Sequence, residues 1–257
     1  MNDNRWVFIG ADKRISACSE NMAARGYECN YFYGDSYTEE LKEMIKRFSP
    51  KHLVFPILQL KNTLPLELLE EGMHVYVGVT SKEWLTPFEE SGVHVHHYLQ
   101  DEQFIWRNAR LTAEAFITEY HLSTKGLIAG RHFYVAGFGK VGKMVAEVLS
   151  SLGAEITIVA RSNSQLGEAS AYRYDALRIT DTFTLKEGCL VNTIPAKWLS
   201  QPSDSRLRIF DLASAPGCLR DNPATEYYTI LPGLPGKHFP VDAAAALADA
   251  LDRIYRR

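Results

Sequence analysis

The fold is decided by residues 131–161, which read RHFYVAGFGKVGKMVAEVLSSLGAEITIVAR. The apolar run 133–136 predicts a short strand. In 141–152 the apolar residues recur every three or four positions, which predicts a helix with one apolar face. A second apolar run, 156–160, predicts another strand. Between the first strand and the helix stand the three glycines of a G-x-G-x-x-G pattern: Gly137, Gly139 and Gly142. This order predicts a βαβ unit of the kind that binds dinucleotides.

Each glycine of the pattern has a mechanical role in such a unit. Gly137 permits the tight turn, Gly139 lets the backbone approach a pyrophosphate, and Gly142 lets the helix pack against the strand. The free N–H groups at the start of the helix would bind the pyrophosphate. We therefore expect the cofactor to contact the whole turn, which comprises Gly137, Phe138, Gly139, Lys140, Val141 and Gly142. The alternative is a Rossmann-like fold that has lost its nucleotide.

The end of the second strand bears on which dinucleotide binds. NAD sites usually place an acid there for the ribose hydroxyls, whereas an arginine accommodates the 2′-phosphate of NADP. This chain has Arg161 followed by Ser162, Asn163 and Ser164. The pattern favours NADP, with NAD as the second possibility. Alternatively, Arg161 is only a solvated residue at a strand end.

Composition and charge exclude several classes of protein. The chain has 257 residues, 28 lysines and arginines, and 31 acids, for a net charge of −3, and no basic block in the sequence suggests a nucleic-acid surface. Its four cysteines form no C-x-x-C pair, which argues against a metal knuckle or a disulfide framework and fits a reducing cytoplasm. No apolar run approaches the roughly 18 residues that cross a membrane, and the N-terminus lacks a signal-peptide core. We predict a cytoplasmic protein without metal, membrane or nucleic-acid partners.

The remainder of the chain predicts an α/β protein with two Rossmann-like lobes. Strands alternate with helices through the first hundred residues, which predicts a parallel sheet covered on both faces. A connector helix, 101–123, leads into the second lobe, and a C-terminal helix capped by Asp242 is expected to return to the first. The predicted domains are 1–123 together with 241–257, and 124–240 for the dinucleotide. The first strand of the first lobe is followed by no glycine triplet, so we expect no nucleotide there.

Two further segments are expected to contact the cofactor. Ligands of open α/β sheets bind beyond the carboxyl ends of the strands, and two predicted strands end at these segments. They are Thr193, Ile194 and Pro195, and Leu212, Ala213 and Ser214. Each could instead be an ordinary exit from a strand into a loop.

Several segments together are similar to the A subunits of bacterial dipicolinate synthases. They are GADKR at 10–14, VGVT at 77–80, NARLTAE at 108–114, VAGFGKVG at 135–142, NTIP at 192–195, DLAS at 211–214 and PGLPGK at 232–237. The resemblance implies a sporulation oxidoreductase that oxidises a dihydro- or hydroxytetrahydro-dipicolinate to dipicolinate and works with a smaller, flavoprotein-like B subunit. The chain departs from the family at Cys218 and at 239–244, where a family threonine is missing and Asp242 stands nearby.

Such a substrate carries two carboxylates and needs cations or N–H donors. Arg14 and Lys237 are the predicted carboxylate ligands, with Arg107 as a further candidate. Thr112, or Asn108 one turn earlier, could donate to a carboxylate. Glu114 lies about 200° round the helix from Thr112 and is either the general base or a structural acid. His96 and His121 are alternative bases.

Two other functions remain open at this point. The chain could be a scaffold subunit that binds NADP and leaves the chemistry to a partner. It could also be a different NAD(P)-dependent dehydrogenase of the opine, hydroxy-acid or shikimate type. In either case we expect a small-molecule ligand and a homo-oligomer.

Overall fold

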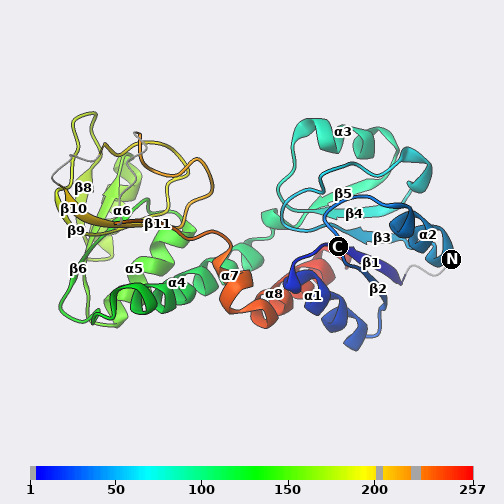
Figure 1. Ribbon diagram of the computed structural model, residues 1–257, viewed down its shortest axis with the longest axis horizontal. Helices are drawn as coiled ribbons and strands as arrows, with labels where there is room; N and C mark the ends of the chain where they lie inside the picture. Colours follow the sequence, from blue (N-terminus) through cyan, green and yellow to red (C-terminus); the bar gives the residue numbers. More distant parts are fainter. Residues whose placement is uncertain (1–3, 201–204, 221–226, 257) are drawn as a thin grey trace. The chain divides into compact units, whose positions relative to one another are not determined.

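The computed structural model describes residues 4–200, 205–220 and 227–256, which form two compact units (Figure 1). Unit 1 runs to Asn108 and resumes at Gly236, and unit 2 comprises Ala109–Pro235. The chain therefore divides at 108/109 and 235/236. The domains drawn from the sequence, 1–123 with 241–257 and 124–240, remain a proposal about which segments fold independently.

Unit 1 is built on a five-stranded parallel sheet with the order β2-β1-β3-β4-β5. Its strands are β1 (Arg5–Ile9), β2 (Glu28–Phe32), β3 (His52–Val54), β4 (His74–Val77) and β5 (His94–His97). Its helices are α1 (Lys13–Ala24), α2 (Glu39–Phe48), α3 (Lys82–Glu90) and α8 (Pro240–Tyr255), with single 3₁₀ turns at η1 (Leu66–Leu68) and η2 (Tyr98–Gln100). This strand order is that of the flavodoxin-like doubly wound fold.

Alternation along β1 gives this sheet a core on each face. Val7 and Ile9 pack with the apolar residues of α2 and α3, whereas Trp6 and Phe8 pack with those of α1 and α8. Because α8 packs along α1, the C-terminal helix returns to the first unit, as the sequence predicts (Figure 1).

The start of α8 differs from the prediction. Phe239 occupies the N-cap position and Pro240 the first turn, so Asp242 is not the cap but an acid within the first turn. Proline suits this position because its missing N–H would be unpaired there in any case. Asp242 still favours the helix by lying near the positive end of its dipole. The segment 232–237, which contains two Pro-Gly pairs, leads into the short helix α7 (Leu234–His238).

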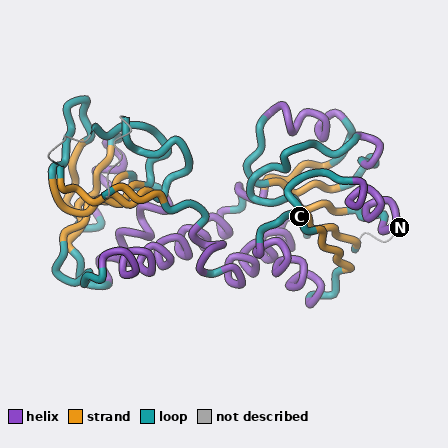
Figure 2. Tube along the Cα trace, in the orientation of Figure 1, coloured by secondary structure: helices purple, strands orange, loops and turns teal. Residues whose placement is uncertain are grey.

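Unit 2 contains a six-stranded parallel sheet with the order β11-β10-β9-β6-β7-β8. Its strands are β6 (His132–Ala136), β7 (Glu155–Ala160), β8 (Asp175–Arg178), β9 (Glu187–Asn192), β10 (Arg206–Asp211) and β11 (Tyr228–Ile230). Its helices are α5 (Lys140–Ser151) and α6 (Asn163–Ala171), and the connector helix α4 (Glu102–Thr124) enters it from unit 1. In both units the strands lie between helices (Figure 2).

The strand order of unit 2 fixes where a ligand would bind. Counted from β6, it is the 3-2-1-4-5-6 order of the Rossmann fold, which reverses between β6 and β9. The predicted fold class, two Rossmann-like α/β lobes with parallel sheets, is confirmed. The glycine turn follows β6, and the segment 193–195 follows β9, so the reversal point lies between these two exits.

Candidate functional site

The site begins at the glycine turn after β6. Gly137 has φ +87°, and a Cβ placed on it would lie 2.6 Å from Thr193 Oγ1. A Cβ on Gly142 would lie 2.0 Å from the carbonyl oxygen of Gly137. The first turn of α5 therefore lies directly against the backbone of the loop, and only glycine permits this approach.

The first turn of α5 is open toward solvent. Gly139 is its N-cap, no side chain caps it, and its first turn carries no acid. A Cβ on Gly139 would have no heavy atom within 4 Å. The first-turn N–H groups and the positive end of the helix dipole therefore lie at a helix start without a side-chain cap, which suits a phosphate.

A cavity of about 470 Å³ lies against this turn, entirely within unit 2. It brings together three segments that the sequence predicts as cofactor contacts: the glycine turn, the end of β7 and the exit of β9. Its lining residues are Gly137, Gly139, Lys140, Val141, Gly142, Arg161, Gln165, Thr193, Ile194 and Pro195. These residues fit a dinucleotide, because they combine backbone donors, an exposed arginine and an apolar edge. Gln165 was not predicted from the sequence as a lining residue, because its position depends on where α6 lies.

Two buried polar residues hold the exit of β9 in place. Asn192 and Asp211 end neighbouring strands and are fully buried. Asn192 Nδ2 donates to Asp211 Oδ1 at 2.8 Å and to the carbonyl oxygen of Ile194 at 3.0 Å. Asn192 Oδ1 accepts from the Ile194 N–H at 3.2 Å and from Trp198 Nε1 at 3.0 Å. This network fixes the loop that lines the cavity.

The carboxylate of Asp211 is the centre of this network. Its Oδ1 also accepts from the N–H of Ala213 at 3.1 Å. Its Oδ2 accepts from the N–H of Cys218 and from the Tyr228 hydroxyl, both at 2.8 Å. Burial, the hydrogen bond to Asp211 and the negative charge of Asp211 raise the pKa of Tyr228, so this hydroxyl remains a donor. Asn192 and Asp211 were not predicted as site residues from the sequence. A detectable signal was present, because each is a polar residue at the end of an apolar strand.

Some predicted cofactor residues do not present side chains to the cavity. Phe138 is 2% exposed, and its ring packs against Tyr172 and Tyr174, so only its backbone is available to a ligand. The hydroxyl of Ser162 accepts the N–H of Gln165 at 3.2 Å and thereby caps α6.

The segment Leu212, Ala213 and Ser214 is absent from the lining of this cavity. It follows β10, which is separated from β6 by β9. Two strand spacings amount to about 10 Å, which takes the exit of β10 away from the glycine turn. The sequence predicts that these residues contact the cofactor, and this contact remains a prediction.

The predicted substrate cations lie in unit 1. Arg14 follows the N-cap residue Asp12, and its Nε lies 3.0 Å from Asp12 Oδ1 and 2.9 Å from Oδ2. A Cβ on Gly236 would lie 2.7 Å from Arg14 Nε, so this guanidinium rests against the residue preceding Lys237. Partial burial raises the pKa of Asp12. Hydrogen bonds from the side chain and N–H of Arg14, together with the Arg14 charge, lower this pKa by more, so the net shift is downward. Arg14 thus carries a permanent carboxylate partner, while Lys237 is exposed.

The other cations and acids proposed for the substrate are largely engaged. Arg107 is ion-paired with Asp249. In unit 2, Thr112 is buried, whereas Glu114 is exposed and accepts from Arg110 Nε at 2.8 Å. Arg110 also contacts Glu147 on α5 at 2.5 Å. Glu114 therefore belongs to a surface ion-pair network between α4 and α5, which is the role of a structural acid.

No histidine is among the residues that line the cavity of unit 2. His96 Nε2 is 2.9 Å from His74 Nδ1 in the unit 1 sheet. Burial and the charges of His74, His94 and His97 lower the pKa of His96 to about 4, which makes it a weak base at neutral pH. His121 is exposed, and its Nδ1 lies 3.1 Å from the carbonyl oxygen of Gly126. Within the described residues no three His, Cys, Asp or Glu side chains are grouped to hold a metal ion. No helix in the described part of the chain is long and apolar enough to cross a bilayer.

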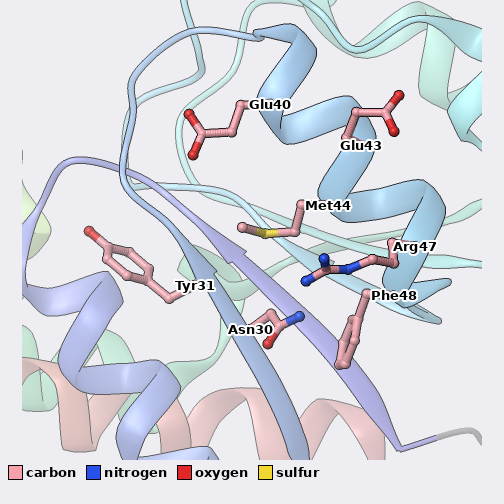
Figure 3. Close-up of a pocket in the computed structure, with 7 residues that line it drawn as sticks. All are labelled: Asn30, Tyr31, Glu40, Glu43, Met44, Arg47 and Phe48. Carbon is pink, nitrogen blue, oxygen red and sulfur yellow. The ribbon is translucent and has the colours of Figure 1, made fainter.

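Unit 1 has a cavity of its own, of about 550 Å³, between β2 and α2 (Figure 3). Asn30 and Tyr31 of β2 face side chains of α2 there, and the charged ones are Glu40, Glu43 and Arg47. Its lining carries charges of both signs and includes none of the predicted site residues. We assign it no role.

Comparison with known proteins supports the resemblance drawn from the sequence motifs. No protein-family model matches the chain. The A subunit of dipicolinate synthase from Bacillus subtilis (strain 168) is 31% identical over an alignment of 159 residues, with 57% of this chain and 52% of that protein covered. The matched stretch therefore spans about half the length of this relative.

Solved structures show the same fold over the whole chain. The A chain of dipicolinate synthase from Bacillus subtilis superposes with a TM-score of 0.81 at 18% identity, covering 100% of this chain and 97% of that one. The corresponding dipicolinate synthase chain from Bacillus halodurans gives 0.76 at 20% identity, with 99% and 98% covered. A transhydrogenase from Sinorhizobium meliloti gives 0.65 at 10% identity, with 97% and 92% covered. The chain thus resembles the A subunits of dipicolinate synthases in motifs and in fold.

Proposed function

We propose that this chain is an NAD(P)-dependent oxidoreductase whose unit 2 binds the dinucleotide. The observation that carries the proposal is the cavity at the start of α5, where the glycine turn, Arg161 and the exit of β9 meet. The names of the proteins that share the fold, dipicolinate synthase chains and a transhydrogenase, agree with it. The nicotinamide would supply the hydride chemistry, and the chain would bind and orient it.

We further propose that the cofactor is NADP. Arg161 is exposed and lines the cavity, and no acid is among the lining residues. A 2′-phosphate carries up to two negative charges, which a guanidinium binds bidentately. An acid that would select the ribose hydroxyls of NAD is missing from the lining. NAD remains the alternative, because the pyrophosphate contacts would be the same for both.

For the substrate we propose a dihydro- or hydroxytetrahydro-dipicolinate, oxidised to dipicolinate in sporulation. Support comes from the resemblance and from Arg14 beside the residue that precedes Lys237. Asp12 holds the Arg14 side chain in one orientation, so a carboxylate would meet a preformed donor. Lys237 would bind the second carboxylate and Thr112 would donate to the ring substituents. Glu114 could act as a base only after leaving Arg110, so we assign it the structural role first.

A flavoprotein-like B subunit, a homo-oligomeric state and a cytoplasmic location complete the proposal by analogy with the dipicolinate synthases. One observation favours the scaffold alternative, in which a partner performs the chemistry. The residues lining the cofactor cavity include no histidine, aspartate or glutamate. The proton released on oxidation would then have to leave through a group outside this lining.

Cofactor binding is tested by titrating NADPH and NADH while following their fluorescence. We expect NADPH to bind at least tenfold more tightly than NADH, and Arg161→Glu to remove that preference. Lys46→Glu, an equal charge reversal on an exposed position of unit 1, is the matched control. Equal binding of both forms by the wild type contradicts the NADP assignment, and binding of neither contradicts the oxidoreductase.

Catalysis is tested by combining the chain with pyruvate, aspartate semialdehyde and the upstream synthase, and recording dipicolinate absorbance. Product formed by this chain alone supports the proposed enzyme. Product formed only when a flavoprotein-like partner is added supports a subunit that works with that partner. NADPH binding without product in any mixture refutes the substrate and leaves the cofactor assignment in place.

A further inference from the structure

The opposite edge of the unit 2 sheet has a second cavity, of about 620 Å³. It lies where β6, β9 and β10 begin, whereas the proposed cofactor lies where β6 and β9 end. Three arginines line it: Arg131, Arg206 and Arg208. We call it the arginine cavity.

Strand register places these arginines together. Arg206 and Arg208 are two positions apart on β10 and therefore project from the same face. They pair with Glu187 and Cys189 of β9. Arg131 stands two residues before Phe133, which pairs with Cys189 from the other side. Burial raises the pKa of Cys189 to about 12, and the charges of Arg208 and Arg131 both oppose this rise, so both guanidinium groups lie near that thiol.

The guanidinium groups have no acidic partner in the described part of the chain. Across residues 4–200, 205–220 and 227–256, no carboxylate oxygen lies within 4.0 Å of Arg131, Arg206 or Arg208. Glu187 is the one acid of the lining, so its arginines outnumber its acids by two. Three arginines gathered without ion pairs leave repulsion that an anion would relieve.

The end of α4 does not account for these charges. The end of the helix would attract cations, but two carbonyl groups of its last turns already accept from local donors. Thr124 Oγ1 donates to the carbonyl oxygen of Tyr120 at 2.7 Å, and the Lys125 N–H donates to that of His121 at 3.0 Å. The arginines are therefore available to a ligand.

The geometry selects the kind of anion. Residues two apart on a strand have Cα atoms roughly 6.6 Å apart, so Arg206 and Arg208 can bind two anionic groups of one small molecule. Arg208 Cζ stands 5.9 Å from the centroid of the Tyr227 ring, which restrains its fork. Guanidinium forks match the oxygen pairs of phosphates and carboxylates.

We propose that the arginine cavity is a second ligand site, which binds a small polyanion bearing phosphate or carboxylate groups. The inference is independent of the redox proposal, since the two cavities occupy opposite edges of the sheet and share no lining residue. A polyanion at this edge would leave the dinucleotide cavity free.

The test is isothermal titration calorimetry with inorganic pyrophosphate and, separately, pyridine-2,6-dicarboxylate. Tighter binding of the first identifies a phosphate ligand, and tighter binding of the second a carboxylate ligand. For whichever binds, we expect Arg206→Gln/Arg208→Gln to weaken binding at least tenfold. Arg131→Gln, on the other side of β9, should weaken it at least threefold, which guards against a folding defect in the double variant.

Two controls locate the anion. Lys46→Gln/Lys82→Gln removes two exposed charges of unit 1 and should leave the affinity unchanged. Saturating NADPH, which would occupy the glycine turn, should also leave it unchanged. The proposal is overturned if neither anion binds, if the arginine variants bind as the wild type does, or if NADPH removes the binding instead.

Discussion

Replacing Asp211 with asparagine tests whether the buried network positions the cofactor loop. The substitution keeps the shape of the side chain and removes its charge. The carboxylate accepts four hydrogen bonds, from Asn192 Nδ2, the N–H of Ala213, the N–H of Cys218 and the Tyr228 hydroxyl. If the asparagine oxygen accepts from Asn192 Nδ2 and the Ala213 N–H, its NH₂ group faces the Cys218 N–H and the Tyr228 hydroxyl, which are also donors.

The expected cost follows from what each donor can do next. The Tyr228 hydroxyl can rotate and accept, but the Cys218 N–H cannot, so one buried donor loses its partner at a cost of about 1–3 kcal/mol. The remaining bonds lose charge assistance, whereas a buried charge is also relieved, and these two effects partly cancel. We expect unit 2 to lose about 2–4 kcal/mol of unfolding free energy. Tyr228→Phe removes one donor only and should cost about 1 kcal/mol.

The assay must report on unit 2 alone. Of the four tryptophans, only Trp198 lies within Ala109–Pro235, and its Nε1 donates to Asn192. With 5-fluorotryptophan, ¹⁹F NMR in urea therefore follows unit 2 through Trp198 and unit 1 through Trp84. Trp198→Phe assigns the resonance. A loss below about 1 kcal/mol for Asp211→Asn, or an equal loss at Trp84, would refute the reasoning. NADPH affinity should fall as well, although Asp211 is not among the residues that line the cavity.

The same assay serves three more predictions. Gly142→Ala should destabilise unit 2 by about 2 kcal/mol or more, since its Cβ at 2.0 Å from the Gly137 oxygen must move outward by about 1 Å. Gly139→Ala, with nothing within 4 Å, should change stability by less than about 0.5 kcal/mol yet weaken NADPH binding, and equal stability losses for both variants would contradict this geometry. Asp101→Asn should lower the unfolding free energy of unit 1, followed at Trp84, by about 2 kcal/mol, because Asp101 caps α4 and its carboxylate lies 2.6 Å from Arg253. The exposed ion pair of Arg110 and Glu114 should contribute under about 1 kcal/mol to the stability of unit 2. His96 has its pKa lowered to about 4 from 6.5, so the fold favours the neutral ring, and the stability of unit 1 should be full above pH 6.5 and fall toward pH 4. Because His96 is only half-buried, this loss of stability should be about 1–2 kcal/mol. His96→Gln should remove most of the pH dependence, and His121→Gln should not.

The regular elements of the chain were predictable where the signal is local. The strand predicted at 133–136 is observed as His132–Ala136, and the helix predicted over 141–152 as Lys140–Ser151. Glycine spacing and apolar periodicity act within a few residues, so neither needs knowledge of the rest of the fold. The edge strand β8 gave no such signal, because only Ala176 among its residues is even half-buried.

The site was predictable only as far as each strand end could be considered by itself. Thr193, Ile194 and Pro195 converge on the glycine turn because β9 pairs with β6, whereas Leu212, Ala213 and Ser214 follow β10 and do not line that cavity. Which strand lies beside which depends on long-range pairing that a single sequence does not display. The arginine cavity was missed for the same reason, because Arg131 and Arg208 are brought together only through β9.

The first residues of the motifs N-T-I-P and D-L-A-S support the loops of the proposed cofactor cavity. Their polar first residues, Asn192 and Asp211, bind each other under the loops and do not line the cavity. In N-T-I-P the next residue, Thr193, donates to the Ala136 carbonyl oxygen at 2.8 Å and so ties the loop to the end of β6. A hydrogen-bonded chain therefore runs from Asp211 through Asn192 and the 193–194 backbone to the glycine turn. Because every link in it is buried or part-buried, Asn192 and Asp211 help to determine the shape of the dinucleotide cavity although they do not line it.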